Sequence, residues 1–155
     1  MALDRWRILL SGLWAGWLLC VALLATPAPF ATLTQADAGR VAGRMLLQEA
    51  YIALVMGALL LVLERVAARR RAGDGDLGEG SQFSTGMALA LGTLFCTVAG
   101  YFAIQPMLVS ARAGQGALSF GQLHAVSAIF FVIKGLLVMV LAWRAAGLVS
   151  RRPSS

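Results

Sequence analysis

Three ionisable side chains lie inside or at the edge of long apolar runs, and their types could do chemistry. The stretch "FGQLHAVS" holds His124, the single histidine of the chain, where an apolar run begins. Ten residues later "FFVIKGLL" places Lys134 among phenylalanines and leucines, and Glu49 lies at the edge of another apolar run. A carboxylate, an ammonium and an imidazole can together bind an ion, a proton or a small polar ligand. The sequence does not name that ligand.

The same inventory argues against an enzyme. Catalysis by side chains needs a nucleophile beside a base or a pair of acids, and a zinc site needs three or four ligands. The chain has one histidine, and neither Cys20 nor Cys96 lies in a CxxC motif. Both cysteines are interpreted as small packing residues, with a disulfide or soft-metal pair as the alternative because they fall at similar depth. We therefore expect no catalytic residues, no metal centre and no cofactor.

The elements that must hold these side chains are four apolar segments. Of the 155 residues, 59% are hydrophobic, against roughly 45–50% in soluble domains. The apolar runs are Ile8–Ala28, Met45–Leu63, Ser84–Ile104 and Phe120–Trp143. Each is long enough to cross a hydrocarbon core of ~30 Å as a helix. The sequence therefore predicts an all-α fold: an integral membrane four-helix bundle in the lipid bilayer, forming a single domain. The expected helices cover about 8–28, 38–66, 84–105 and 120–147, with a loop at about 67–83.

The arginines predict the orientation of this bundle. The side that carries both termini and the middle loop holds Arg5, Arg7, Arg65, Arg69, Arg70, Arg71, Arg144, Arg151 and Arg152. The opposite side holds Arg40, Arg44 and Arg112. Because cytoplasmic segments collect lysine and arginine, we expect both termini in the cytoplasm and the protein in the bacterial inner membrane.

The run of three arginines in the middle loop predicts one lipid contact. Arg69, Arg70 and Arg71 follow a membrane segment directly, where they would face anionic headgroups. A nucleic-acid role is not expected, because the run is short, is followed by acidic residues and lacks interleaved aromatic residues.

The depths of Lys134 and Glu49 predict that they meet. Lys134 lies ten residues, ~15 Å of helix, from Arg144, and Glu49 lies sixteen residues, ~24 Å, from Arg65. A charge at such depth costs at least ~2.5–3.5 kcal/mol on insertion scales, so it rarely faces lipid. A lysine stem and a glutamate can bridge much of the ~9 Å offset. We therefore expect both side chains to point inward and to be linked directly or through water.

Further polar residues belong to the same hypothetical site. We expect His124 at the periplasmic mouth, and the ligand or ion site is completed by Gln105, Arg112 and Arg44. Two interpretations remain open. In one, the charges form a structural ion pair that fixes helix register, and His124 is an interfacial hydrogen-bonding residue. In the other, they line a small polar cavity that opens to the periplasm and binds an ion, a proton or a small ligand.

Small residues at four-residue spacing predict close helix packing, because lipid gives apolar helices no hydrophobic drive to associate. Such spacing joins Gly12, Gly16 and Cys20 in the first helix, and in the third helix it joins Ala88, Gly92, Cys96 and Gly100. Two prolines mark expected helix ends: Pro27 should end the first helix and turn the chain, and Pro106 should close the third.

Four stretches carry a family resemblance: "LWAGWLLCVALLATPAPFATL", "AGRVAGRMLLQEAYIAL", "GYFAIQPMLVSAR" and "FGQLHAVSAIFFVIKGLL". In order and spacing they resemble a bacterial membrane family similar to transmembrane protein 205, a domain of unknown function. Its recurrent residues fall here on Trp14, Gly16, Pro27, Phe30, Gly39, Gly43, Glu49, Tyr51, Gln105, Pro106, Arg112, Phe120, His124 and Ser127. The resemblance implies four membrane helices in the inner membrane and no agreed activity. The chain departs from it at Ala125, often glycine, and at Phe131, commonly tyrosine or asparagine, which weakens the case for a wet path along the fourth helix.

Three functions follow as hypotheses. The leading one is an inner-membrane protein of undefined role with a polar site at Glu49, Lys134 and His124 that faces the periplasm. The second is a small-solute or metal-ion transport or tolerance component, working as a homo-oligomer because one four-helix unit encloses little pathway. The third is a membrane interaction subunit that docks a partner on its small-residue ridges.

Overall fold

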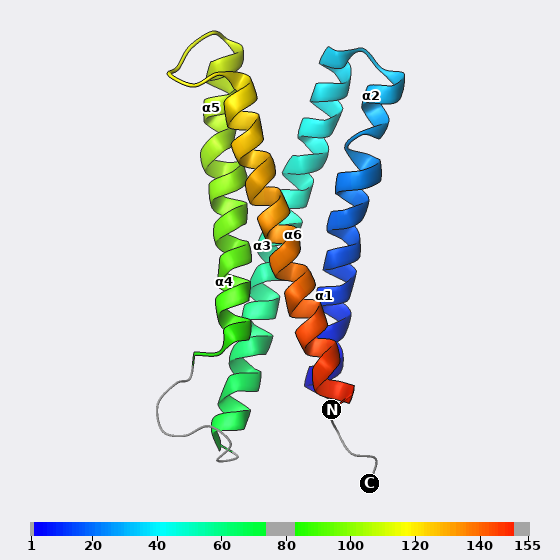
Figure 1. Ribbon diagram of the computed structural model, residues 1–155, viewed down its shortest axis with the longest axis vertical. Coiled ribbons are helices and arrows are strands. Elements are labelled where there is room, and N and C mark those ends of the chain that lie inside the picture. Colours follow the sequence, from blue (N-terminus) through cyan, green and yellow to red (C-terminus); the bar gives the residue numbers. More distant parts are fainter. Residues whose placement is uncertain (1, 74–82, 151–155) are drawn as a thin grey trace.

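The computed structural model describes residues 2–73 and 83–150, and all of its regular elements are helices (Figure 1). In chain order they are α1 (Ala2–Cys20), the π-helix η1 (Val21–Ala25), α2 (Ala28–Thr32), α3 (Gln35–Gly73), α4 (Thr85–Thr97), the π-helix η2 (Val98–Ala103), α5 (Ile104–Arg112) and α6 (Phe120–Ser150). Four helical rods are long and apolar enough to cross a membrane: Ala2–Thr32, Gln35–Ala72, Thr85–Arg112 and Phe120–Gly147. The first three are longer than the helices expected from the sequence, and the fourth has the expected bounds.

The prediction that Pro106 ends its helix is wrong, whereas Pro27 lies at a break between two helical segments of the first rod. In the first rod a turn at Thr26 and Pro27 separates η1 from the short helix α2, whereas the third rod continues through Pro106 to Arg112. In both rods a π-helical segment, η1 or η2, comes shortly before the proline. A π-bulge and a proline both depart from the regular i→i−4 hydrogen-bond ladder, so placing them together confines the disturbance to one point of the rod.

The rods form a ring in which each helix has two close neighbours. α6 packs against α1 and α4, and α3 packs against α4 and, less extensively, α1. Consequently α3 and α6 lie diagonally across the bundle rather than side by side. A side chain that joins these two helices must therefore cross the interior.

The distribution of side chains is that of a protein surrounded by lipid. Its core is built largely from small residues, with Ala53 and Ala90 completely buried beside Trp14 and Val138. Large apolar side chains point outward instead, among them Leu23, which is 69% exposed. In water such a surface would be very costly, whereas in a bilayer the tails solvate it and small interior residues let helices approach closely.

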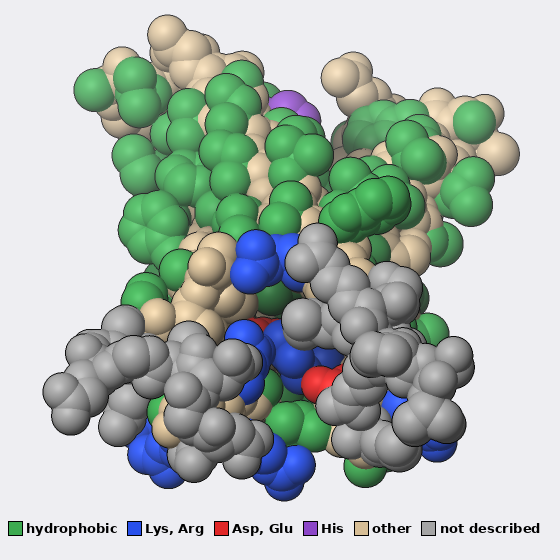
Figure 2. Space-filling model, turned by 60° about the horizontal axis from the view of Figure 1, so that its bottom comes forward, with side chains coloured by type: hydrophobic (Ala, Val, Ile, Leu, Met, Phe, Trp, Pro, Cys, Tyr) green, Lys and Arg blue, Asp and Glu red, His purple; other side chains and the backbone are tan. Residues whose placement is uncertain are grey.

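The two ends of the bundle differ in charge. One end, called here the basic end, carries the first described residue and the end of α6 (Figure 1). Exposed or half-buried arginines gather on it, and Figure 2 shows basic side chains across this end of the molecule. They are Arg5, Arg65, Arg69, Arg70, Arg71 and Arg144. The opposite end, called here the far end, carries α2 and the turn between α5 and α6 (Figure 1).

The helices separate into two hairpins toward the far end. There α3 packs on η1 and α2, while α6 packs on η2 and α5. Figure 1 shows the far ends of α3 and α6 spreading apart, and the space-filling view shows a notch in the outline between the two hairpins (Figure 2). The bundle is thus closed toward the basic end and divided toward the far end.

Candidate functional site

A buried ion pair, called here the central ion pair, joins α3 to α6 across the diagonal of the bundle. The Lys134 ammonium donates to both carboxylate oxygens of Glu49, with Nζ at 2.8 Å from Oε1 and from Oε2. Glu49 is 2% exposed and Lys134 is 3% exposed. The two residues were expected to be linked directly or through water, and the structure has the direct contact.

Helix geometry and small neighbours position the pair. The next residue along α3, Ala50, and the residue one turn further, Ala53, are completely buried, so this face of α3 lies against the other helices. On α6, Phe131 places its ring 4.8 Å from Lys134 Nζ, a cation–π contact. Cys96 of α4 is a buried free thiol.

Mutual neutralisation makes this arrangement tolerable. An isolated charge at this depth would be strongly unfavourable, and a bidentate contact between opposite charges offsets much of that desolvation cost. Removing one partner leaves the other charged and buried, which in soluble proteins typically costs ~3–5 kcal/mol. Each charged group is therefore tolerated at this depth only while its partner is present.

The other residues assigned to the site lie toward the far end and do not join the central ion pair. His124 is exposed, and its ring stacks on Phe120 with centroids 5.8 Å apart and planes 9° from parallel. The Arg112 guanidinium lies over the same Phe120 ring, 4.7 Å from its centroid. Gln105 is half-buried and Arg44 is exposed. Among the described residues, no hydrogen bond or ion pair connects any of these four to the pair.

Ser127 adds a contact inside the second hairpin. Its hydroxyl donates to the carbonyl oxygen of Gly100 at 2.7 Å, which ties α6 to the π-helix η2. A β-carbon on Gly100 would lie only 2.4 Å from Cβ of Phe130, so only glycine allows this approach of the two backbones.

The four packing glycines occupy two different environments. Gly92 faces α6, because its added β-carbon would meet Leu137 Cδ1 at 3.0 Å, and Gly100 faces α6 as described above. A β-carbon on Gly12 or Gly16 would meet nothing within 4 Å. These two glycines instead line a shallow, open groove on the outside of α1, called here the α1 groove. Its lining residues are Ile8, Leu9, Gly12, Leu13, Gly16, Trp17 and Cys20.

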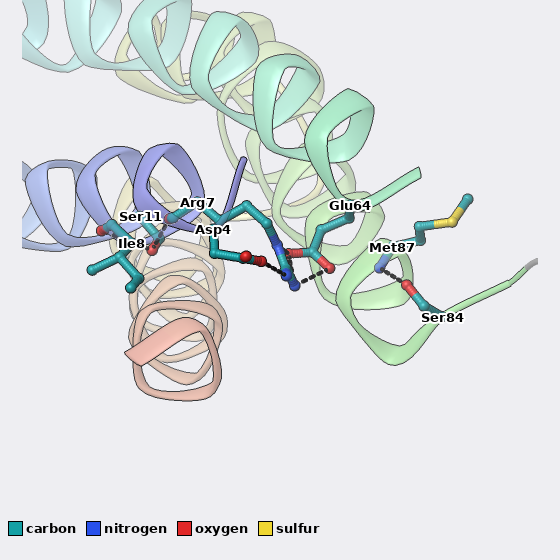
Figure 3. A network of polar contacts seen from close by, with 7 residues as sticks. All are labelled: Asp4, Arg7, Ile8, Ser11, Glu64, Ser84 and Met87. Carbon is teal, nitrogen blue, oxygen red and sulfur yellow. Dashed lines mark hydrogen bonds and ion pairs between the residues drawn. The ribbon is translucent and has the colours of Figure 1, made fainter. Parts of the chain in front are cut away.

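A second buried ion pair, called here the basic-end ion pair, was missed by the sequence analysis (Figure 3). Arg7 of α1 donates to Glu64 of α3 twice, from Nε to Oε1 at 2.7 Å and from Nη2 to Oε2 at 2.8 Å. Asp4 approaches Arg7 Nη1 at 3.5 Å, and Ser11 donates to the Arg7 carbonyl at 2.6 Å. Arg7 is 5% and Glu64 3% exposed. The available signal was Glu64 itself, an acid at the membrane end of an otherwise arginine-rich segment.

The start of α4 is shaped to fit this pair. Ser84 caps the helix by accepting a hydrogen bond from the Met87 amide at 3.3 Å (Figure 3). Two residues later, a β-carbon on Gly86 would lie 1.9 Å from Glu64 Oε2, closer than atoms can approach. The glycine thus makes room for the carboxylate, and three helices meet at the basic-end ion pair.

A metal site would need several ligating side chains close together. In the described ranges, 2–73 and 83–150, no three His, Cys, Asp or Glu side chains gather into a group that could hold a metal ion. Cys20 is exposed, Cys96 is buried, and both are free thiols.

Comparison with known proteins gives a family but no activity. No curated protein and no solved structure matches the chain. Residues 9–117, which include α1 from its middle, all of α3 and α4, and Glu49, match a family described as a domain of unknown function. This match covers more than half of the chain, so the protein, built from four apolar helices of membrane-spanning length, belongs to the family "Domain of unknown function (DUF4149)".

Proposed function

We propose that this chain is a multi-pass protein of the bacterial inner membrane whose central ion pair, Glu49–Lys134, is a binding site for a small solute or ion reached from the periplasmic side. The observation that carries the proposal is the position of the pair. It crosses the diagonal of the bundle, with Lys134 Nζ 2.8 Å from each Glu49 oxygen. Intramembrane charges that face a bundle interior commonly mark the pathway of an ion or solute.

The shape of the molecule supports access from the far end. The two hairpins diverge toward the far end, and the notch between them opens at that end (Figures 1 and 2). The basic end is closed by a second buried ion pair, Arg7–Glu64. The arginine asymmetry favours a cytoplasmic basic end, so the notch would face the periplasm.

Thermal unfolding of the purified protein in detergent tests the proposal. A panel of small solutes and ions is screened, and one that binds should stabilise the protein, by about 2.7 kcal/mol at a concentration of 100 Kd. The doubly neutral variant Glu49→Gln/Lys134→Met keeps the size of both side chains and should lose this response. The matched control Arg7→Gln/Glu64→Gln removes the other pair and should retain it. An equal response in the Glu49→Gln/Lys134→Met protein would reject the site.

A second candidate function, a membrane interaction subunit, is favoured by the α1 groove. Gly12 and Gly16 leave the backbone of α1 open to the outside, and small residues at this spacing allow another helix to approach closely. Cys20, exposed at the same face, provides a native reporter.

Crosslinking in membranes tests this alternative. If two copies meet through the α1 groove, mild oxidation should join them through Cys20, and Gly16→Leu should abolish the product. Gly135→Leu is the control, because a β-carbon on Gly135 also meets nothing within 4 Å but Gly135 lies on α6 and does not line the groove. A crosslink that survives Gly16→Leu would exclude docking through this groove.

A further inference from the structure

We propose that the central ion pair selects a small zwitterion, a molecule carrying both an ammonium and a carboxylate, over a simple cation or anion. This inference rests on the proposed function, since it names the chemical class that the site would take. It follows from the contact between Glu49 and Lys134, in which both carboxylate oxygens are already engaged by one ammonium.

Charge balance in a buried site limits what can replace this contact. A bare cation that binds Glu49 displaces the Lys134 ammonium and leaves it charged without a partner. A bare anion that binds Lys134 leaves the Glu49 carboxylate in the same condition. Both residues are at most 3% exposed, so water gives the abandoned group little compensation. A zwitterion instead gives each group a new partner of opposite charge, and the site stays neutral.

The surrounding structure allows the two groups to part. Because α3 and α6 lie diagonally and do not pack side by side, no close helix interface has to be broken to separate them. The lysine side chain has four rotatable bonds, so its ammonium can withdraw from Glu49 without a shift of the α6 backbone. Phe131, on the same helix, offers its ring as a second contact for a cationic group in this region.

A further hydrogen-bond donor is buried in the bundle core. Trp14 is 1% exposed, and its indole Nε1 has no hydrogen-bond partner among the described residues. It belongs to the same core cluster as Ala53 and Val138. These residues stand one helical turn from Glu49 on α3 and from Lys134 on α6, respectively. A buried N–H without an acceptor is unusual, and a ligand carboxylate is an acceptor of the kind that Trp14 lacks.

Three probes of nearly the same size test the selection in the purified full-length protein. β-Alanine carries both charges, propylammonium carries the ammonium alone, and propionate carries the carboxylate alone. Dissociation constants are measured by ligand-dependent thermal unfolding in detergent. We expect β-alanine to bind the wild-type protein at least about tenfold more tightly than either ion, because neither ion leaves the site neutral.

Single variants should invert this preference in opposite directions. Lys134→Met leaves the Glu49 carboxylate alone and should favour propylammonium, whereas Glu49→Gln leaves the Lys134 ammonium alone and should favour propionate. The Arg7→Gln/Glu64→Gln protein, which loses only the basic-end ion pair, should keep the wild-type order. A merely structural pair would not produce opposite changes in ligand charge preference.

The outcomes separate this inference from the proposed function. If the wild-type protein binds either bare ion as tightly as β-alanine, and Glu49→Gln/Lys134→Met abolishes that binding, the site exists and the zwitterion preference is wrong. If glycine, β-alanine, γ-aminobutyrate and the two ions all leave wild-type unfolding unchanged, the inference is again wrong, and a null result in the wider solute panel would reject the proposed function as well. If a single variant yields no monodisperse protein, the wild-type ranking decides alone.

Discussion

Gly86 of α4 lies directly against the carboxylate of Glu64 on α3. A β-carbon at this position would come within 1.9 Å of Glu64 Oε2 and 2.4 Å of its Cδ, so the absence of a side chain is what admits the carboxylate. The same carboxylate holds Arg7 of α1 in a bidentate contact. One glycine thereby determines whether three helices can meet at the basic end.

The first prediction concerns this glycine. Gly86→Ala should lower the free energy of unfolding by at least about 2 kcal/mol, because the methyl group must displace a buried, paired carboxylate. Chemical unfolding in mixed micelles, followed by helical circular dichroism, measures the change. Gly135→Ala is the control: its β-carbon meets nothing within 4 Å, and the substitution should be neutral or slightly stabilising. Equal effects of the two substitutions would contradict the close fit of Gly86 against the Glu64 carboxylate.

The second prediction concerns the basic-end ion pair. Arg7→Met or Glu64→Met alone should each cost about 3–5 kcal/mol, since either leaves an opposite charge buried without its main partner. The double variant should recover most of that loss, because two apolar side chains can fill the same volume. A double-mutant cycle on unfolding free energies gives the coupling between Arg7 and Glu64. A coupling free energy near zero would mean that the contact between Arg7 and Glu64 does not contribute to the stability of the protein.

The third prediction separates two glycines of the third rod. Gly100→Ala should destabilise the protein by about 1–3 kcal/mol, because its methyl group meets Phe130 Cβ at 2.4 Å, an atom fixed to the α6 backbone. Gly92→Ala should have little effect, because it meets Leu137 Cδ1, the end of a flexible side chain, at 3.0 Å. Thermal unfolding of the two variants side by side tests the contrast. A larger loss of stability for Gly92→Ala than for Gly100→Ala would contradict this prediction.

The fourth prediction concerns orientation. In a protein without native cysteines, Ala72→Cys at the basic end of α3 should resist a membrane-impermeant thiol reagent in intact cells and react after permeabilisation. Gln115→Cys, in the exposed far-end turn, should react in intact cells. The opposite labelling pattern would mean that the basic end faces the periplasm and the notch faces the cytoplasm.

The sequence was sufficient for the class of fold and for one buried contact. Apolar length alone predicts four membrane-spanning helices, because every backbone polar group in lipid must be paired within its own segment. The contact between Glu49 and Lys134 could be predicted for a similar reason: charges at depth need partners, and these two were opposite charges within apolar segments. Depth follows from counting residues, so it requires no knowledge of which helix faces which.

Which face of each helix points into the bundle was decided only by the tertiary structure. In a soluble helix, the apolar stripe marks the buried face, but in lipid both faces are apolar and the pattern carries little information. For this reason Gly12 and Gly16 looked equivalent to Gly92 and Gly100, although the first two line an outward groove and the others contact α6. Packing of three helices around Gly86 likewise buried Arg7, which by sequence was one more arginine of the basic end.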